Sequence, residues 1–163
     1  MLKSKIYQQI DNVANNGTPG HLSRPGNAAS IAIIDNRELA NTDGVVQLSG
    51  FGRIYDIDPA ASTEDDLVMV LGTEKDLQRE VVLFDKVFTA DTTFRMDVQF
   101  HLQGQAYQGV STVSFSTGEV VTRSFDVADC GSNNFTAIQF RNTKLSDSSV
   151  KTAISMFNVF LFQ

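Results

Sequence analysis

The stretch Thr93–Gln103, TFRMDVQFHLQ, decides the fold of this chain, because apolar and polar residues alternate along it without exception. The apolar residues are Phe94, Met96, Val98, Phe100 and Leu102, and the polar ones are Arg95, Asp97, Gln99, His101 and Gln103. A two-residue period places the two sets on opposite faces of a β-strand. The stretch therefore predicts an antiparallel sheet with one buried face and one face in solvent.

From Val45 onward, similar segments follow one another, separated by turns rich in Gly, Asp and Asn. They predict strands over Val45–Ile54, Leu67–Thr73, Arg79–Thr89, Thr93–Gln103, Gly109–Ser116, Val120–Val127, Thr136–Arg141 and Ile154–Phe162. Ile31–Ile34 is expected to form a short strand or a buried turn. Because no helical segment separates the strands, we predict an all-β protein, an antiparallel two-sheet β-sandwich of the jelly-roll kind.

The N-terminal residues follow a different pattern. Apolar residues in Leu2–Ala14 recur at spacings of four, four and three, which is typical of one stripe of an amphipathic helix. They are Leu2, Ile6, Ile10 and Val13. Asn15–Ser30 contains two Pro-Gly pairs, which favour an extended arm. We therefore predict a short helix and arm over residues 1–30 and a β-sandwich domain over residues 31–163.

The last predicted strand, Ile154–Phe162, is apolar on both faces, so both faces are expected to be covered. The cover is either the N-terminal helix or another copy of the chain. The predicted contact residues are Ile6, Ile10, Val13, Phe157, Val159 and Leu161. On the second alternative the protein is a homo-oligomer.

Composition narrows the function classes. The 163 residues suffice for one domain with an ordinary core, and the single cysteine, Cys130, excludes an internal disulfide. The net charge of -6 opposes binding to nucleic acid, which requires a basic surface. The sequence shows neither the apolar core of a signal peptide nor a run long enough to span a membrane. We therefore expect synthesis in a host cytoplasm and no membrane partner.

No catalytic motif interrupts the strand pattern. His101 and Asp97 lie two places apart on the polar face of one strand, which is one arrangement of a catalytic dyad. A nucleophile would have to be Ser111, Ser114 or Ser124, and none of these lies in a G-x-S-x-G turn. We interpret the pair as ordinary polar pairing on an exposed face and predict a protein that is not an enzyme and needs no cofactor.

Acidic residues gather around one predicted turn. They are Asp56, Asp58, Glu64, Asp65 and Asp66. Oxygen-rich turns can bind Ca²⁺, although the spacing here does not match an EF-hand loop. A solvated acidic loop is the preferred interpretation, and a calcium site at Asp56, Asp58, Asp65 and Asp66 is the alternative.

The strand order over residues 66–163 resembles that of galactose-binding-like jelly-roll sandwiches, including many carbohydrate-binding modules. The segments that carry the resemblance are LVMVLGT, REVVLFDKVFTADTTFRMDVQFHLQ, EVVTRSFDV, FTAIQFRN and ISMFNVFLF. The chain departs from these modules in having no Trp and no evident set of aromatic residues for stacking on a sugar ring. The same pattern also looks like the jelly rolls and sandwiches of virion proteins.

Two functions follow as hypotheses. The first is a non-catalytic structural protein of a virus or phage particle, as a capsid, decoration or appendage subunit. It would assemble with its own copies and with other virion proteins through the sandwich and the N-terminal arm. The alternative is a carbohydrate-binding module. Its predicted glycan-binding face consists of Arg95, Asp97, Gln99, His101 and Gln103.

Overall fold

The computed structural model describes residues 4–11, 32–33, 45–73, 76–103, 106–127, 137–141 and 151–162. Only the backbone is described for residues 4–11, 32–33 and 155–162 and for some residues of the other strands. The described residues form ten β-strands and no helix, and none of them lies in a helix that could cross a membrane. The strands are β1 (Ser4–Asp11), β2 (Ala32–Ile33), β3 (Val45–Tyr55), β4 (Thr63–Thr73), β5 (Asp76–Phe88), β6 (Thr92–Gln103), β7 (Ala106–Phe115), β8 (Val120–Val127), β9 (Ala137–Arg141) and β10 (Lys151–Phe162).

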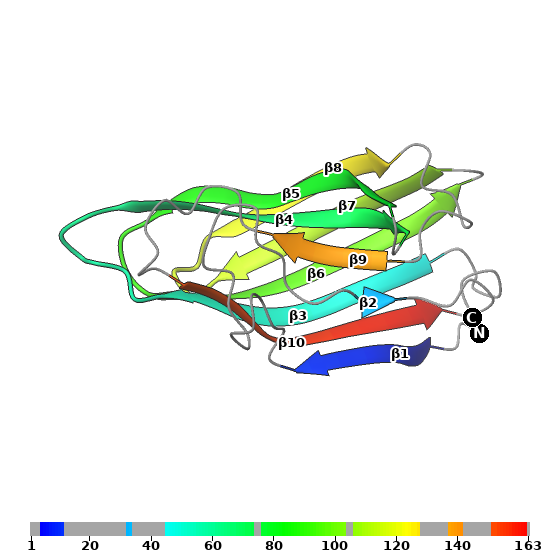
Figure 1. The fold of residues 1–163 in the computed structure, drawn as a ribbon, viewed down its shortest axis with the longest axis horizontal. Coiled ribbons are helices and arrows are strands. Elements are labelled where there is room, and N and C mark those ends of the chain that lie inside the picture. The colour runs from blue at the N-terminus through cyan, green and yellow to red at the C-terminus, as the bar shows by residue number, and fades with distance from the viewer. Residues whose placement is uncertain are drawn as a thin grey trace.

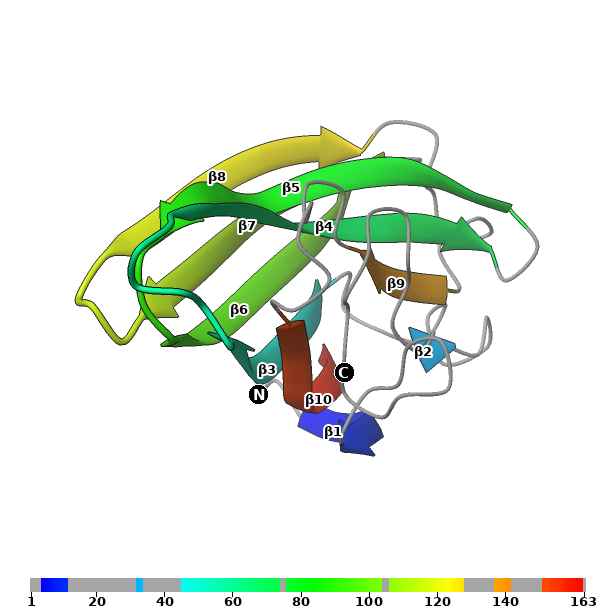
Figure 2. The ribbon, with the colours of Figure 1, turned by 60° about the vertical axis from the view of Figure 1, so that its left-hand side comes forward.

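The strands form two antiparallel sheets (Figure 1). One has six strands in the order β1-β10-β3-β6-β7-β8, and the other has four in the order β2-β9-β4-β5. Figure 2 shows the sheets as two layers, with β5 and β8 beside each other along one side. The predicted antiparallel β-sandwich is therefore confirmed.

All eight predicted strands from Val45 onward exist, and Val120–Val127 has the predicted bounds. The short segment near Ile31–Ile34 contains strand β2, which pairs with β9. The largest difference is in β4, which begins at Thr63 and not at Leu67. Glu64, Asp65 and Asp66 therefore belong to a strand and not to a turn.

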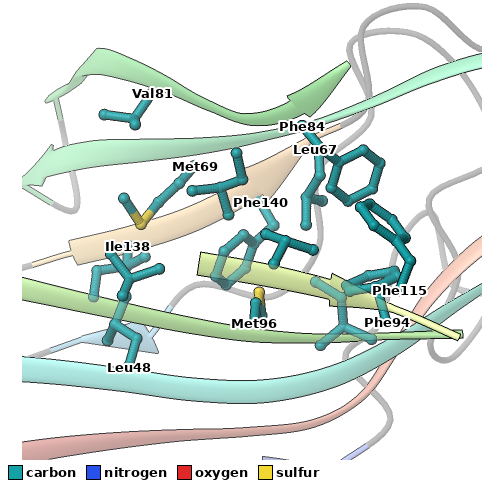
Figure 3. Packing of buried hydrophobic residues seen from close by; sticks show 14 of the residues in the cluster. Leu48, Leu67, Met69, Val81, Phe84, Phe94, Met96, Phe115, Ile138 and Phe140 are labelled. Atoms are coloured by element: carbon teal, nitrogen blue, oxygen red, sulfur yellow. The ribbon is translucent and has the colours of Figure 1, made fainter. Parts of the chain in front are cut away.

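The core lies between the two sheets and is formed by the inward-facing apolar residues of strands in which apolar and polar residues alternate. On β6, Phe94, Met96, Val98 and Phe100 are buried, with exposed fractions of 3% or less. On β3, the same period buries Val46, Leu48 and Ile54. Figure 3 shows Leu48, Phe94 and Met96 of the six-stranded sheet packed against inward side chains of β4, β5 and β9. The buried face predicted from Thr93–Gln103 is confirmed for these four residues of β6, and Leu102 lies outside the described side chains.

Phenylalanine rings join the two sheets at one end of the core. The ring centroid of Phe84 on β5 lies 5.3 Å from that of Phe94 and 5.1 Å from that of Phe115, both on the opposite sheet. The Phe84 ring meets each of them edge to face, an arrangement that aromatic pairs prefer. Phe84 is fully buried (Figure 3). This ring therefore connects the sheets through packing alone.

The helix predicted over Leu2–Ala14 is not found in its described part, because Ser4–Asp11 form strand β1. A spacing of four residues, as between Ile6 and Ile10, fits two strand periods as well as one helical turn. Thirteen residues are also marginal for a helix without tertiary support. Pairing with the edge of β10 supplies seven residues of β1 with strand partners, and this long-range contact decides the conformation.

Strand β10 lies between β1 and β3, with a partner on each edge. The N-terminal segment therefore runs beside the last strand and does not lie across it. On the core side, Thr152 and Ile154 are buried. The structure does not describe the side chains of five predicted contact residues, namely Ile6, Ile10, Phe157, Val159 and Leu161. Val13 and the predicted domain boundary near residue 30 lie outside the described residues.

Candidate functional site

The outer face of the six-stranded sheet is a broad surface of polar side chains. Where one strand residue points into the core, the next points into solvent, so the strands β3, β6, β7 and β8 present their outward residues in register. Four rows cross the strands: Phe51, Arg95, Ser114 and Val120; Ser49, Asp97, Thr112 and Thr122; Gln47, Gln99, Val110 and Ser124; and Val45, His101, Gln108 and Asp126.

An exposed aromatic ring lies at one end of this face. Phe51 on β3 is 40% exposed and pairs in register with Arg95 on β6. The guanidinium carbon of Arg95 lies 5.6 Å from the centroid of the Phe51 ring, within the range of a cation–π contact. The Nε atom of Arg95 also lies 3.6 Å from an oxygen of Asp97. The Phe51 ring, the Arg95 guanidinium and the Asp97 carboxylate therefore lie next to one another at the surface.

A hollow of about 440 Å³ opens beside Phe51. Its described lining includes Arg53 and Arg95 and the hydroxyl residues Thr93, Ser114 and Ser116. Arg53 stacks over the ring of Tyr55 with its guanidinium carbon 4.3 Å from the ring centroid. The hollow therefore combines an apolar floor with hydrogen-bond donors around it, as small-ligand sites do.

A second hollow, of about 560 Å³, lies at the His101 end of the face. Here Gly109 allows the Phe125 ring to lie against the sheet, because a β-carbon at Gly109 would overlap with that ring. A β-carbon there would also lie 2.9 Å from the backbone oxygen of Gln99. The Phe125 ring packs edge to face on the buried Phe100. The Phe125 ring therefore belongs with the core, whereas the Phe51 ring at the other end of the face is exposed to solvent.

Four of the predicted glycan-binding residues lie together on this face, in one line along β6: Arg95, Asp97, Gln99 and His101. The side chain of Arg95 is 61% exposed and that of Asp97 is 39% exposed, and Gln99 and His101 are also exposed. The side chain of Gln103 is not described.

Sequence reasoning missed Phe51, which supplies the aromatic ring that the polar strand alone lacks. The signal was present, because in VVQLSGFGRIY the inward positions are Val46, Leu48, Gly50, Gly52 and Ile54, so Phe51 falls among the polar residues.

The serines considered as nucleophiles do not meet His101 in one site. Ser111 is fully buried on the core side of β7, and its hydroxyl has no hydrogen-bond partner among the described residues. His101 lies on the outer side of β6. Ser114 and Ser124 are exposed but lie in other rows of the face. Asp97 pairs with Arg95. The described arrangement thus offers no His–Asp–Ser constellation among these residues.

The acidic residues predicted around one turn are divided between two environments. Asp56 and Asp58 lie in the exposed turn after β3, where Asp58 accepts a hydrogen bond from the backbone N–H of Ala60. Asp65 and Asp66 are buried within β4, so the solvated acidic loop is wrong for these two. Among the residues that the structure describes, no three His, Cys, Asp or Glu side chains are grouped to bind a metal ion.

Asp65 instead forms a buried polar contact between the sheets. The hydroxyl of Thr152 on β10 donates to Asp65 Oδ2 at 2.6 Å, and the backbone N–H of Asp66 donates to Oδ1 at 2.7 Å. Burial raises the pKa of Asp65 from 3.8 to about 7. The two hydrogen bonds lower the pKa, and the charges of Asp66 and Asp85 raise it. This carboxyl is a structural group that titrates near neutral pH.

Solved structures with the same architecture were found by comparison, although no protein-family model and no curated protein matches the sequence. The CBM2 module of the evolved Dit of Lactobacillus casei BL23 phage J-1 has a TM-score of 0.57 and 10% identity, covering 99% of this chain and 97% of that one. Basic winged bean lectin with Tn-antigen has a TM-score of 0.52 and 12% identity, covering 98% and 91%. A Lotus tetragonolobus seed lectin has a TM-score of 0.51 and 8% identity, covering 99% and 94%.

The fold is a jelly-roll β-sandwich. This is the fold that the sequence resemblance implied. The coverage shows that the likeness extends over almost the entire length of this chain and of each of these structures. At identities of 8 to 12% the likeness concerns the fold, and function has to be argued from the residues of the outer face.

Proposed function

We propose that this chain is a carbohydrate-binding β-sandwich that holds its ligand on the outer face of the six-stranded sheet. The observation that carries the proposal is the exposed Phe51 ring beside Arg95, within a surface of hydroxyl and amide side chains. A sugar ring has an apolar C–H face and an edge of hydroxyls. An exposed aromatic ring with polar neighbours suits both, because the ring packs on the apolar face while Ser, Gln and Arg side chains hydrogen-bond to the edge.

The fold adds support, because lectins and a CBM2 module share it. Planar, bidentate groups on β6 suit the recognition of neighbouring hydroxyls. Gln99 both donates and accepts through its amide, Asp97 accepts, and Arg95 donates from a fixed fork. All three lie on β6, with Arg95 in the row of Phe51, Asp97 in the next row and Gln99 in the row after that.

Alanine substitutions on this face test the proposal. Phe51→Ala and Arg95→Ala are each expected to weaken glycan binding at least tenfold, about 1.4 kcal/mol, and Gln99→Ala by a smaller factor. A glycan array followed by calorimetry on the best ligand measures this. Val87→Ala is the control, because Val87 is 56% exposed on the opposite sheet. Failure to bind any glycan, or binding that all three substitutions leave unchanged, would refute the proposal.

A second candidate function is a structural role in a virus or phage particle, and the CBM2 module of a phage Dit favours it by its similarity over the whole chain. We propose that this chain is such a virion subunit and that it assembles with copies of itself through the N-terminal segment and the last strand. Light scattering on the intact chain tests the assembly. A mass of two or more chains is expected, and a single-chain mass at all concentrations up to the millimolar range would contradict it.

A further inference from the structure

The hollow beside Phe51 is positively charged on a protein that is acidic overall. Two of its described lining residues, Arg53 and Arg95, are cationic, and none of its described lining residues is a carboxylate. The whole chain carries a net charge of -6. A local excess of positive charge against an acidic background attracts anions and not cations. This charge is the part of the site that the proposed carbohydrate function does not by itself require.

Both arginines are held in place by aromatic rings. The Arg53 guanidinium lies 4.3 Å from the Tyr55 ring centroid, and the Arg95 guanidinium lies 5.6 Å from the Phe51 ring centroid. A guanidinium on a ring keeps its N–H groups directed sideways, where a ligand can accept them. Because the rings restrict the two side chains before a ligand arrives, less conformational entropy is lost on binding.

The contact with Asp97 does not neutralise the hollow. It joins Arg95 Nε to an Asp97 oxygen at 3.6 Å, longer than a normal hydrogen bond, between side chains that are 61% and 39% exposed. Such exposed ion pairs are weak. A ligand anion that forms a short bidentate pair with the Arg95 fork would make stronger hydrogen bonds than Asp97 does.

We propose that the Phe51 hollow binds an anionic saccharide, with the sugar ring packed on Phe51 and its carboxylate or phosphate paired with Arg95 and Arg53. The hydroxyls of Thr93, Ser114 and Ser116 lie around the same hollow and suit the remaining sugar hydroxyls. This inference rests on the proposed carbohydrate function and adds the charge of the ligand to it.

The test uses the full chain on an array of matched pairs. Each pair has one acidic saccharide, carboxylated (uronic or sialic) or phosphorylated, beside its uncharged counterpart. Calorimetry on the best pair follows at low and moderate salt. We expect at least tenfold tighter binding of the acidic member, with affinity falling as salt rises. The carboxylated and phosphorylated pairs distinguish the two sources of the anion.

Charge-removing variants connect this preference to the hollow. Arg53→Gln and Arg95→Gln are each expected to remove most of the acidic preference, so that affinity for the acidic member falls at least tenfold further than affinity for the neutral member. Arg123→Gln, an exposed arginine on β8 outside the hollow, is the matched control. Circular dichroism and urea unfolding confirm that each variant is folded.

The outcomes separate the two proposals. Equal binding of acidic and neutral members, or an acidic preference that survives both substitutions, would overturn the anionic-saccharide site and leave the carbohydrate function standing. Binding of no saccharide on the array would overturn both.

Discussion

Replacing Asp65 by Asn is expected to make the protein more stable at pH 8, by up to about 4 kcal/mol, and to change its stability little at pH 4. The reason is the buried contact between the sheets, in which the Asp65 carboxyl is fully enclosed beside Thr152. Burial raises its pKa to about 7, against 3.8 in the unfolded chain. Asn resembles the protonated acid, because its amide donates to the Thr152 hydroxyl while its oxygen accepts from the Asp66 N–H.

The sign follows from which state keeps the proton. Well below pH 3.8 the Asp65 carboxyl is protonated in both the folded and the unfolded protein, so the wild type has its full stability. Between pH 3.8 and about 7 the unfolded chain loses the proton while the folded protein keeps it, and each pH unit lowers the free energy of unfolding by about 1.4 kcal/mol. Above pH 7 the loss is complete. The Asn variant has no such loss.

Urea unfolding of both proteins at unit intervals from pH 4 to pH 8 measures the effect as a difference between them. Asp58→Asn is the matched control, since Asp58 is exposed and the amide can still accept the Ala60 N–H. A stability difference between wild type and Asp65→Asn that is the same at pH 4 and pH 8 would contradict the prediction.

Phe84→Ala is expected to destabilise the protein by about 3–5 kcal/mol. Phe84 is fully buried, and its ring contacts both Phe94 and Phe115 on the other sheet. Phe88 also packs against it, with ring centroids 5.9 Å apart. Removing the ring leaves a cavity between two sheets that are each held rigid by their own hydrogen bonds, so the space cannot easily close.

Phe51→Ala is the control for this prediction, because it makes the same change at a position where the Phe ring is 40% exposed. It is expected to change stability by no more than about 1 kcal/mol. Phe84→Leu should lie between the two, since it keeps part of the volume. Equal destabilisation by Phe84→Ala and Phe51→Ala, measured by urea unfolding at pH 5, would show that the inter-sheet ring cluster is not a main source of stability.

The strands of the sandwich could be predicted from the sequence because they depend on a local pattern. In Thr93–Gln103 the period of two specifies both the element and its faces, and the burial of Phe94 and Met96 follows that period. The polar line from Arg95 to His101 could be found in the same way. The N-terminal segment could not be assigned so, because Ile6 and Ile10 are four apart and this spacing fits a helix and a strand alike.

The candidate site could be predicted only in part for a related reason. A period describes one strand at a time, whereas Phe51 and Arg95 belong to β3 and β6 and become neighbours through the register between them. Phe51 could be assigned to the polar side of its strand, but not to the side of Arg95. Asp65 was assigned to a solvated loop because a run of acidic residues is usually exposed. Its burial depends on the contact with Thr152 of the other sheet, which the local sequence does not reveal.

By itself, the sequence determined the class of fold, nearly all of the strands from Val45 onward, and which residues point into the core on a strictly alternating strand such as β6. The tertiary structure alone decided the pairing of Ser4–Asp11 with β10, the meeting of Phe51 with Arg95, and the burial of Asp65 against Thr152. The physical reason is the same in all three cases. Each contact joins residues far apart in the chain, and its free energy depends on neighbours that only strand register and sheet packing supply.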